Sequence, residues 1–548
     1  MSAVKNNHRW RWLTAGAVAV SLLAFILLIL LLGMTGLRYF WPQPVTLFTL
    51  QKPAGQTLML GEQVSAGRVS RQQLLDSGVS LPSSLPEEVT RYLIKTGNRD
   101  FADTDFHSLL SSEIIDENYP SGVIALQRRS GGMAYGWFDG LLENGQPLIA
   151  KNMMQVLQQR IKQTRERQKQ ADAIRRVSMA KLNSEMEQLA EQQRHLKQQH
   201  RYTAQAESIH QADSAEIQRQ FAAKANQLIA LNNESASTVL ILRDVHGLQH
   251  QVPLSNIMAA WYPNAMSYGE KWQHFLLQLW HFVSGSSGSS LGDEGVFPAI
   301  FGTVLMVLLM SVVVMPLGVI AAIWLHEYAG NSLMTRLVRI AVVNLAGVPS
   351  IVYGVFGLGF FVWLVGGSLD QLFFASALPN PTFGTPGLLW ASLTLALLTL
   401  PVVIVATEEG LSRIPQSLRQ GSLALGATQA ETLWHVTLPL AIPAMLTGLI
   451  LAVARAAGET APLMLVGVVK MVPELPVDSI FPYLHLDRKF MHLGFQIYDL
   501  AFQSPNAQAD RPLVFATALL LVIIILALNL LAMALRHRLR ERYRALMN

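Results

Sequence analysis

The sequence of 548 residues contains no cysteine, so it can form neither a disulfide bond nor a thiolate metal site. Charged residues are scarce as well, at 14% of the chain, whereas hydrophobic residues make up 51%. This composition excludes an ordinary soluble globular protein and indicates a membrane protein. The net charge of +5 is therefore interpreted as a sign of membrane topology, and nucleic acid is not an expected partner.

Motifs that carry chemistry are missing too. The chain has no phosphate-binding loop of the form Gly-x4-Gly-Lys-Ser/Thr and no cluster with the spacing of a metal site or an activated nucleophile. His485 and His492 have a spacing that suits no common metal site, and we expect both to face solvent. The sequence thus predicts a protein that is not an enzyme, has no metal or cofactor of its own and relies on a partner for any use of ATP.

Six apolar runs come close to the length of about 20 residues that a helix needs to cross a bilayer. They are Leu13–Gly33, Pro298–Leu325, Ile340–Val365, Leu388–Ala406, Leu440–Val468 and Leu513–Leu535. The first run follows basic residues, as a cleavable signal peptide would, but its apolar core is long and Gly33-Met34-Thr35 is a poor cleavage site. We expect a retained anchor, and hence an all-α polytopic membrane protein with six transmembrane helices.

Basic residues define the expected orientation of these helices. Lys and Arg gather before the first run, after the second and fourth runs, and in the tail at 536–548, whereas the short loop Gly366–Gly387 has none. Positive residues mark cytoplasmic loops. We therefore expect both termini, 1–12 and 536–548, to be cytoplasmic in the inner membrane of a bacterial cell. Residues 34–297 are then periplasmic.

The segment 34–297 is predicted to be an inserted α+β domain. Short apolar or alternating runs, separated by turn signals such as Ser130-Gly131-Gly132, are typical of strands. These runs are Val45–Leu50, Gln56–Leu60, Arg91–Lys95, Gly122–Gln127, Met133–Phe138, Thr238–Leu242 and His250–Leu254. Residues 152–234 instead have almost no Gly or Pro and carry imperfect heptads, which predicts a long helical, coiled-coil segment. An antiparallel hairpin that turns near His200–Ser214 and a single rod both fit this pattern.

The end of this domain carries an amphipathic stretch, Tyr268–Val283, in which Trp, Phe and Leu residues are frequent. Such a stretch could lie at the outer membrane–water interface, where Trp is favoured. The Gly- and Ser-rich residues that follow it are expected to form a flexible connector.

The polar loop 408–438, between the fourth and fifth runs, contains Gln420-Gly421-Ser422-Leu423-Ala424-Leu425-Gly426-Ala427-Thr428 and then Val436-Thr437-Leu438-Pro439. Gly421 and Gly426 are expected to interrupt a helix, so that a short segment can lie across the membrane face. A plain connector is the alternative. The pattern resembles the cytoplasmic EAA loop of ABC-importer permeases, which docks on a separate ATPase subunit.

This resemblance assigns ATPase coupling to a set of residues in the loop. They are Gln420, Gly421, Ser422, Leu425, Gly426, Ala427, Leu438 and Pro439. Gln420-Gly421-Ser422 differs from the Glu-Ala-Ala of the family at all three positions, so an ion pair made by the family Glu is not carried over to this chain.

Arg455 and Glu459 are charged residues inside the fifth run. Charges in a bilayer are costly and usually face a cavity, a pathway or a partner. A spacing of four places the two on one helix face, where they can pair, and Arg offers a planar fork of donors that suits an oxyanion. A local ion pair that only lowers the cost of insertion is the alternative.

The segment Arg455-Ala456-Ala457-Gly458-Glu459-Thr460-Ala461-Pro462-Leu463 after the loop resembles the PstA-type permease subunits of phosphate ABC importers. Phe297–Thr303, Glu327-Tyr328 and Gly347–Gly354 match as well, so the resemblance covers about Phe297–Arg538. It implies a type I permease fold for 298–535 and a phosphate path that includes Arg455, Glu459 and Thr460. Residues 34–297 have no counterpart in the short members of the family.

The same resemblance implies the partners. They are a PstC-like permease, a PstB-like ATPase dimer that binds ATP and Mg, and a periplasmic phosphate-binding protein. Two alternatives stay open: an importer permease for another oxyanion, or a phosphate-sensing scaffold that acts through its periplasmic coiled segment.

Overall fold

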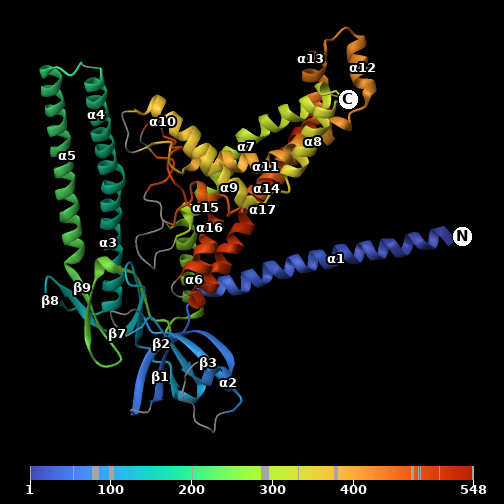
Figure 1. Ribbon diagram of the computed structural model, residues 1–548. Coiled ribbons are helices and arrows are strands. Elements are labelled where there is room, and N and C mark those ends of the chain that lie inside the picture. Colours follow the sequence, from blue (N-terminus) through green and yellow to red (C-terminus); the bar gives the residue numbers. More distant parts are fainter. Residues whose placement is uncertain are drawn as a thin grey trace. The chain divides into compact units, whose positions relative to one another are not determined.

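The computed structural model of the chain describes residues 2–52, 55–76, 86–97, 104–199, 201–285, 295–330, 332–375, 381–470, 474–478, 481, 483–504 and 507–545. Two compact units make up the chain (Figure 1). The membrane unit consists of Met1–Tyr39 and Val296–Asn548, and the sheet unit is Phe40–Gly295. The membrane unit therefore combines segments from both sides of the sheet unit in the sequence.

The membrane unit is mainly helical, with isolated β-bridges between Val468 and Phe490 and between Val477 and Leu484. Its elements are α1 (Ser2–Leu37), α7 (Phe297–Ile323), the π-helical η5 (Trp324–Tyr328), α8 (Leu333–Leu345), α9 (Ser350–Phe356), η6 (Gly357–Gly366), α10 (Gly367–Phe373), α11 (Leu388–Ser412), α12 (Gln416–Ala424), α13 (Gln429–Thr432), η8 (Leu433–Thr437), α14 (Leu438–Gly458), α15 (Leu463–Val466), α16 (Leu493–Tyr498), η9 (Asp499–Gln503) and α17 (Ala507–Ala545). In the described part of the chain, six helical segments are long and apolar enough to cross a membrane, which confirms the predicted number.

The ends of the segments differ from those of the predicted runs, and in two cases the helix breaks where the predicted run continues. The third begins at Ser350 and not at Ile340, because α8 is a separate helix that ends before Gly347 and Pro349. The fifth ends at Gly458 and not at Val468, because Glu459 has an extended backbone with φ −79° and ψ 130°. Apolar composition alone did not reveal these breaks.

The core of the membrane unit lies around α11, most of whose side chains are buried. The helices α7 and α14 pack against α11 and close this core. Its buried members include Met306, Met310, Val314, Leu395, Leu398, Val403, Ala452, Ala456 and Phe490. Several are small residues, which let helices approach closely in a membrane, where packing replaces the hydrophobic effect as the driving force.

The sheet unit contains two antiparallel sheets. The first, in the order β4-β3-β2-β1-β5, is formed by β1 (Val45–Lys52), β2 (Gly55–Ser70), β3 (Glu88–Lys95), β4 (Phe106–Leu110) and β5 (Ile114–Asn118). The second, in the order β10-β9-β7-β6-β11 with β8 beside β7, is formed by β6 (Val123–Arg128), β7 (Met133–Glu143), β8 (Gln146–Leu148), β9 (Thr238–Arg243), β10 (Gln249–Pro253) and β11 (Ile257–Trp261). Val45 and Leu60 of the first sheet share a core with Val123 and Tyr135 of the second. The short α2 (Arg71–Asp76) follows β2.

The predicted helical segment between these strands has the shape of a hairpin (Figure 1). One arm consists of α3 (Met153–Ala173), the π-helical η3 (Ile174–Met179) and α4 (Ala180–Gln198), and α5 (Ala204–Ala236) returns beside it. Thr203 caps α5 by accepting a hydrogen bond from the backbone N–H of Ala206. Leu157 and Ile161 at the base of α3 are buried in the core of the second sheet. Of the two shapes that the sequence left open, the structure has the hairpin.

Candidate functional site

The loop 408–438 contains two short helices, α12 and α13, joined by a glycine turn. Gly426 has a φ of 90°, a left-handed conformation that glycine adopts without strain. Thr428 then starts α13 with a capping box, in which its hydroxyl oxygen accepts from the N–H of Glu431 and its own N–H donates to the Glu431 carboxylate. The expectation for Gly421 was wrong, because this glycine lies inside α12 and does not interrupt it.

Large apolar side chains cover the outside of this segment. Leu425 at the turn is 91% exposed and Trp434 is 68% exposed, and Leu418 and Leu423 are exposed as well. Contiguous exposed apolar side chains mark surfaces that bind another molecule. The predicted coupling residues Gln420, Gly421, Leu425 and Gly426 lie on this exposed part, whereas Ser422, Ala427, Leu438 and Pro439 are half-buried.

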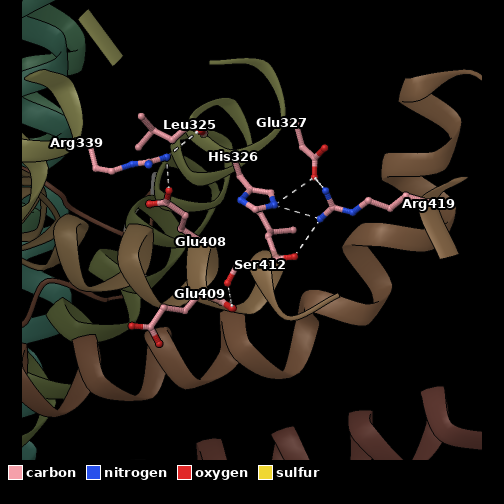
Figure 2. A network of polar contacts seen from close by, with 9 residues as sticks. Leu325, His326, Glu327, Arg339, Glu408, Glu409, Ser412 and Arg419 are labelled. Carbon is pink, nitrogen blue, oxygen red and sulfur yellow. Dashed lines mark hydrogen bonds and ion pairs between the residues drawn. The ribbon is translucent and has the colours of Figure 1, made fainter. Parts of the chain in front are cut away.

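Arg419 joins α12 to the rest of the membrane unit (Figure 2). Its guanidinium lies 2.7 Å from the carboxylate of Glu327 in η5 and donates a hydrogen bond of 3.0 Å to the backbone carbonyl of Leu411 in α11. A nitrogen of His326 lies 3.3 Å from the same guanidinium. The side chain of Arg419 is only 20% exposed and that of Glu327 only 25%. One cation therefore ties α12 to two long helical segments.

A second arginine, from α8, also binds η5 and α11. Arg339 of α8 lies 2.6 Å from the carboxylate of Glu408 in α11 and donates to the carbonyl of Leu325 in η5 at 3.3 Å (Figure 2). The π-helical turn η5 therefore binds both arginines, Arg339 through the backbone carbonyl of Leu325 and Arg419 through the carboxylate of Glu327. We call Glu327, Arg339, Glu408 and Arg419 the linking network. These pairs could not be predicted from the sequence, because their members lie in different helices.

The charged pair in the fifth apolar run lies at the other end of α14. Arg455 and Glu459 are both half-buried, with 3.5 Å between Nε and the carboxylate. Glu459 follows the last residue of α14, so the pair spans the end of the helix. Thr460 is half-buried next to it, and its carbonyl accepts from the N–H of Leu463 at the start of α15. The structure thus brings the three predicted path residues together.

The other segments that match the permease motifs meet near this pair. Gly354 packs on Pro462, where a Cβ would lie 2.7 Å from the proline Cα, and Gly302 packs on the carbonyl of Met491, where a Cβ would lie 2.1 Å away. The hydroxyl oxygen of Thr303 accepts from the N–H of Leu493 at 3.0 Å. Glycine is therefore required at these contacts because the neighbour is backbone and cannot move aside.

The prediction that His485 and His492 face solvent was wrong. His492 is fully buried before α16, and its Nδ1 accepts from the N–H of Gly494 at 3.1 Å. Burial lowers the pKa of His492 to about 4, so its ring is neutral at neutral pH. The Nε2 of His485 lies 3.0 Å from Asp478, and only 13% of that side chain is exposed. Polar loop composition did not reveal that this segment packs inside the unit.

Six membrane-length helices, a short helical segment with an exposed apolar surface and a charged pair at a helix end define a multi-pass membrane transport component. A comparison with protein families agrees with this class, because residues 314–545 match the model of the binding-protein-dependent transport system inner membrane component. The chain belongs to this family. The resemblance to PstA-type permeases is confirmed by the relatives described next.

Three curated relatives are phosphate transport system permease proteins. The chain is 39% identical over 174 residues to PstA 1 of Mycobacterium tuberculosis, a match that covers 32% of this chain and 51% of the relative. It is 30% identical over 251 residues to the probable PstA of Methanocaldococcus jannaschii, with coverage of 45% and 76%. It is 33% identical over 239 residues to PstA of Yersinia pestis, with coverage of 43% and 71%. The chain spans about half the length of the first of these relatives.

Proposed function

We propose that this chain is a permease subunit of an ATP-driven phosphate importer. It would form the translocation path with a homologous, PstC-like permease and couple to a PstB-like ATPase dimer through the loop 408–438. The matches to the Methanocaldococcus jannaschii and Yersinia pestis relatives cover 76% and 71% of those proteins, and both are named phosphate transport permeases. These matches support the assignment. The observation that carries the proposal is the half-buried pair of Arg455 and Glu459, which lies at the end of a membrane helix.

The chemistry of this pair suits a phosphate ion. An arginine presents five N–H donors in a planar fork and keeps its charge at any physiological pH. Glu459 engages the Nε side of Arg455, so this pair leaves the terminal amino groups to bind anionic oxygens. Glu459 holds the guanidinium in place and offsets its charge while the path is empty. Thr460 adds a hydroxyl beside the pair.

The coupling segment supplies the second half of the function. The exposed Leu425 and Trp434 would dock on the ATPase, which binds ATP and Mg, so that this chain needs no cofactor of its own. Closure of the ATPase dimer would then move α12 and α13, and the two permeases would open their shared cavity to one side at a time. A periplasmic phosphate-binding protein would deliver the ion.

The arrangement in the cell follows from the basic residues near the membrane helices. Both termini would be cytoplasmic in the bacterial inner membrane, and the sheet unit would be periplasmic. This orientation places the coupling segment on the side where ATP is available and the pair of Arg455 and Glu459 toward the side from which phosphate arrives.

Phosphate uptake by cells that carry Arg455→Gln tests the proposal. With the protein present at normal levels in the membrane, we expect uptake to fall at least tenfold, and Arg455→Lys to recover part of it because the charge is kept and the fork is lost. Competition with sulfate in the unchanged protein checks the substrate, since a phosphate path should not yield to sulfate. Undiminished uptake by Arg455→Gln would remove this arginine from the path.

A further inference from the structure

Three polar side chains of α6 (Tyr268–Ser284) contact its own unit, whereas Glu270 and Gln273 are exposed. Gln278 donates a hydrogen bond of 2.9 Å to the side chain of Gln127 in β6. His281 lies 3.1 Å from the guanidinium of Arg165 in α3, and the ring of His274 packs on Trp261 of β11 at 4.4 Å between centroids. Polar contacts thus hold one face of α6 against the sheet unit.

The opposite face of α6 is apolar and exposed. We define the aromatic stripe as the exposed side chains of Tyr268, Trp272, Leu276 and Trp280, with Leu277 beside them. Because four-residue spacing keeps side chains on one side of a helix, the first four form a continuous row. All five are more than half exposed to solvent. Because Phe282 on the inner side is buried, α6 carries apolar side chains on both faces, whereas an amphipathic helix on a soluble core keeps them inward.

Contacts within the sheet unit tie this helix to the point where the chain leaves the membrane. Trp41 lies edge-on to Trp272 with 5.4 Å between ring centroids, and Phe40 lies 5.0 Å from Phe282. Phe40 is the last residue of the first membrane-length segment. From Ser284 the chain continues toward Phe297, where the second membrane-length segment begins. In the sequence, α6 is therefore close to the second membrane-length segment, and it contacts the last residue of the first.

We propose that the aromatic stripe lies in the interfacial layer of the membrane, with α6 parallel to the bilayer surface. Trp and Tyr are the residues favoured at that depth, since their rings are apolar and their N–H and O–H groups stay hydrated. Arg165 beside α6 is engaged by His281 inside the unit, and the stripe itself contains no basic residue. The binding is therefore expected to depend on apolar burial and not on anionic lipid.

The absence of cysteine from the chain allows a direct test with the full-length protein. Single cysteines at Leu276→Cys and Trp280→Cys carry a nitroxide label, and the protein is placed in nanodiscs of phosphatidylcholine with and without phosphatidylglycerol. The matched control is Gln220→Cys, an exposed site on α5 of the same unit. Leu277→Cys is a second site on the stripe if either variant reaches the membrane poorly.

Collisions of the label with oxygen and with a water-soluble nickel chelate report the depth. We expect the oxygen-to-nickel collision ratio at positions 276 and 280 to be several-fold higher than at position 220, and equal in both lipid mixtures. A ratio equal to that of position 220 would overturn the proposal, because the stripe would then face water. Low collision rates with both reagents would overturn it too, since they would show that a protein covers the stripe.

Discussion

Replacement of Arg419 by alanine should uncouple the short helix α12 from the membrane helices. The substitution removes the ion pair of 2.7 Å with Glu327 and the hydrogen bond of 3.0 Å to the Leu411 carbonyl. Exposed ion pairs contribute up to about 1 kcal/mol, whereas hydrogen bonds to charged groups with restricted access to water contribute about 1.5–3 kcal/mol. Since both side chains are at least three-quarters buried, we expect a loss of about 2 kcal/mol from the contact between α12 and its supports.

A loss of this size changes an equilibrium by a factor of roughly 30. The assay is phosphate uptake into proteoliposomes that contain this chain with the proposed PstC-like permease and PstB-like ATPase, expressed as phosphate moved per ATP hydrolysed. We expect Arg419→Ala to lower this ratio by about tenfold while the ATPase still co-purifies, because the exposed docking side chains are unchanged. The charge exchange Glu327→Arg with Arg419→Glu should restore part of the ratio, since it restores the ion pair but not the bond to Leu411.

The matched control for this experiment is Arg413→Ala. Arg413 belongs to the same loop and pairs with Glu409 at 3.7 Å, but its side chain is 81% exposed, so its removal should leave the ratio unchanged. Equal behaviour of Arg419→Ala and Arg413→Ala would refute the idea that the linking network transmits motion. Loss of ATPase co-purification in Arg419→Ala would refute it as well, because the arginine would then act in docking.

Two further predictions concern the coupling surface and the sheet unit. Leu425→Asp should abolish co-purification of the ATPase, because burying a carboxylate in an apolar contact is costly, whereas Leu425→Met should retain it. Co-purification with the Asp variant would show that the docking surface lies elsewhere. Burial lowers the pKa of His274 from 6.5 to about 4. Between these pH values the unfolded state binds more protons than the folded state, so the folded sheet unit loses stability as the pH falls from 7 to 4. We expect a loss of about 2 kcal/mol, which is less than the full shift implies because the ring is partly open to water. Thermal unfolding of the full chain and of His274→Gln at both pH values checks this, and an equal acid shift in the two proteins would contradict it.

Local patterns were sufficient for the parts of the fold in which each element depends on its own residues. The six membrane helices follow from apolar length, and the glycine turn at Gly426 follows from the need for a positive φ. The strands β1, β3 and β6 follow from short apolar runs. The edge strand β5 was missed because Asp116 and Glu117 make it polar, and β8 was missed because it has only 3 residues.

Features that depend on distant partners could not be predicted in this way. His326 and Arg419 are 93 positions apart, and nothing in either local sequence states that they meet. His492 is buried although it lies in a polar stretch, and the N–H of its neighbour Leu493 donates to the hydroxyl oxygen of Thr303, 190 positions away. The three residues predicted for the phosphate path lie together because they are neighbours in the chain, so the sequence alone places them side by side.

The wide turn of η5 has a consequence for how this chain compares with its relatives. A π turn holds one residue more than an α turn, and each residue of a helix advances by about 100° around the axis. The direction of Glu327 is therefore set by an inserted residue in Trp324–Tyr328 and not by the repeat of α7. Deleting one residue there would restore the regular pitch and swing the carboxylate away from Arg419. A homologue with a regular α-helix at this point would need its acidic residue at a different position to make the same ion pair. The position of that acidic residue in an alignment would therefore distinguish permeases with the π turn from those without it.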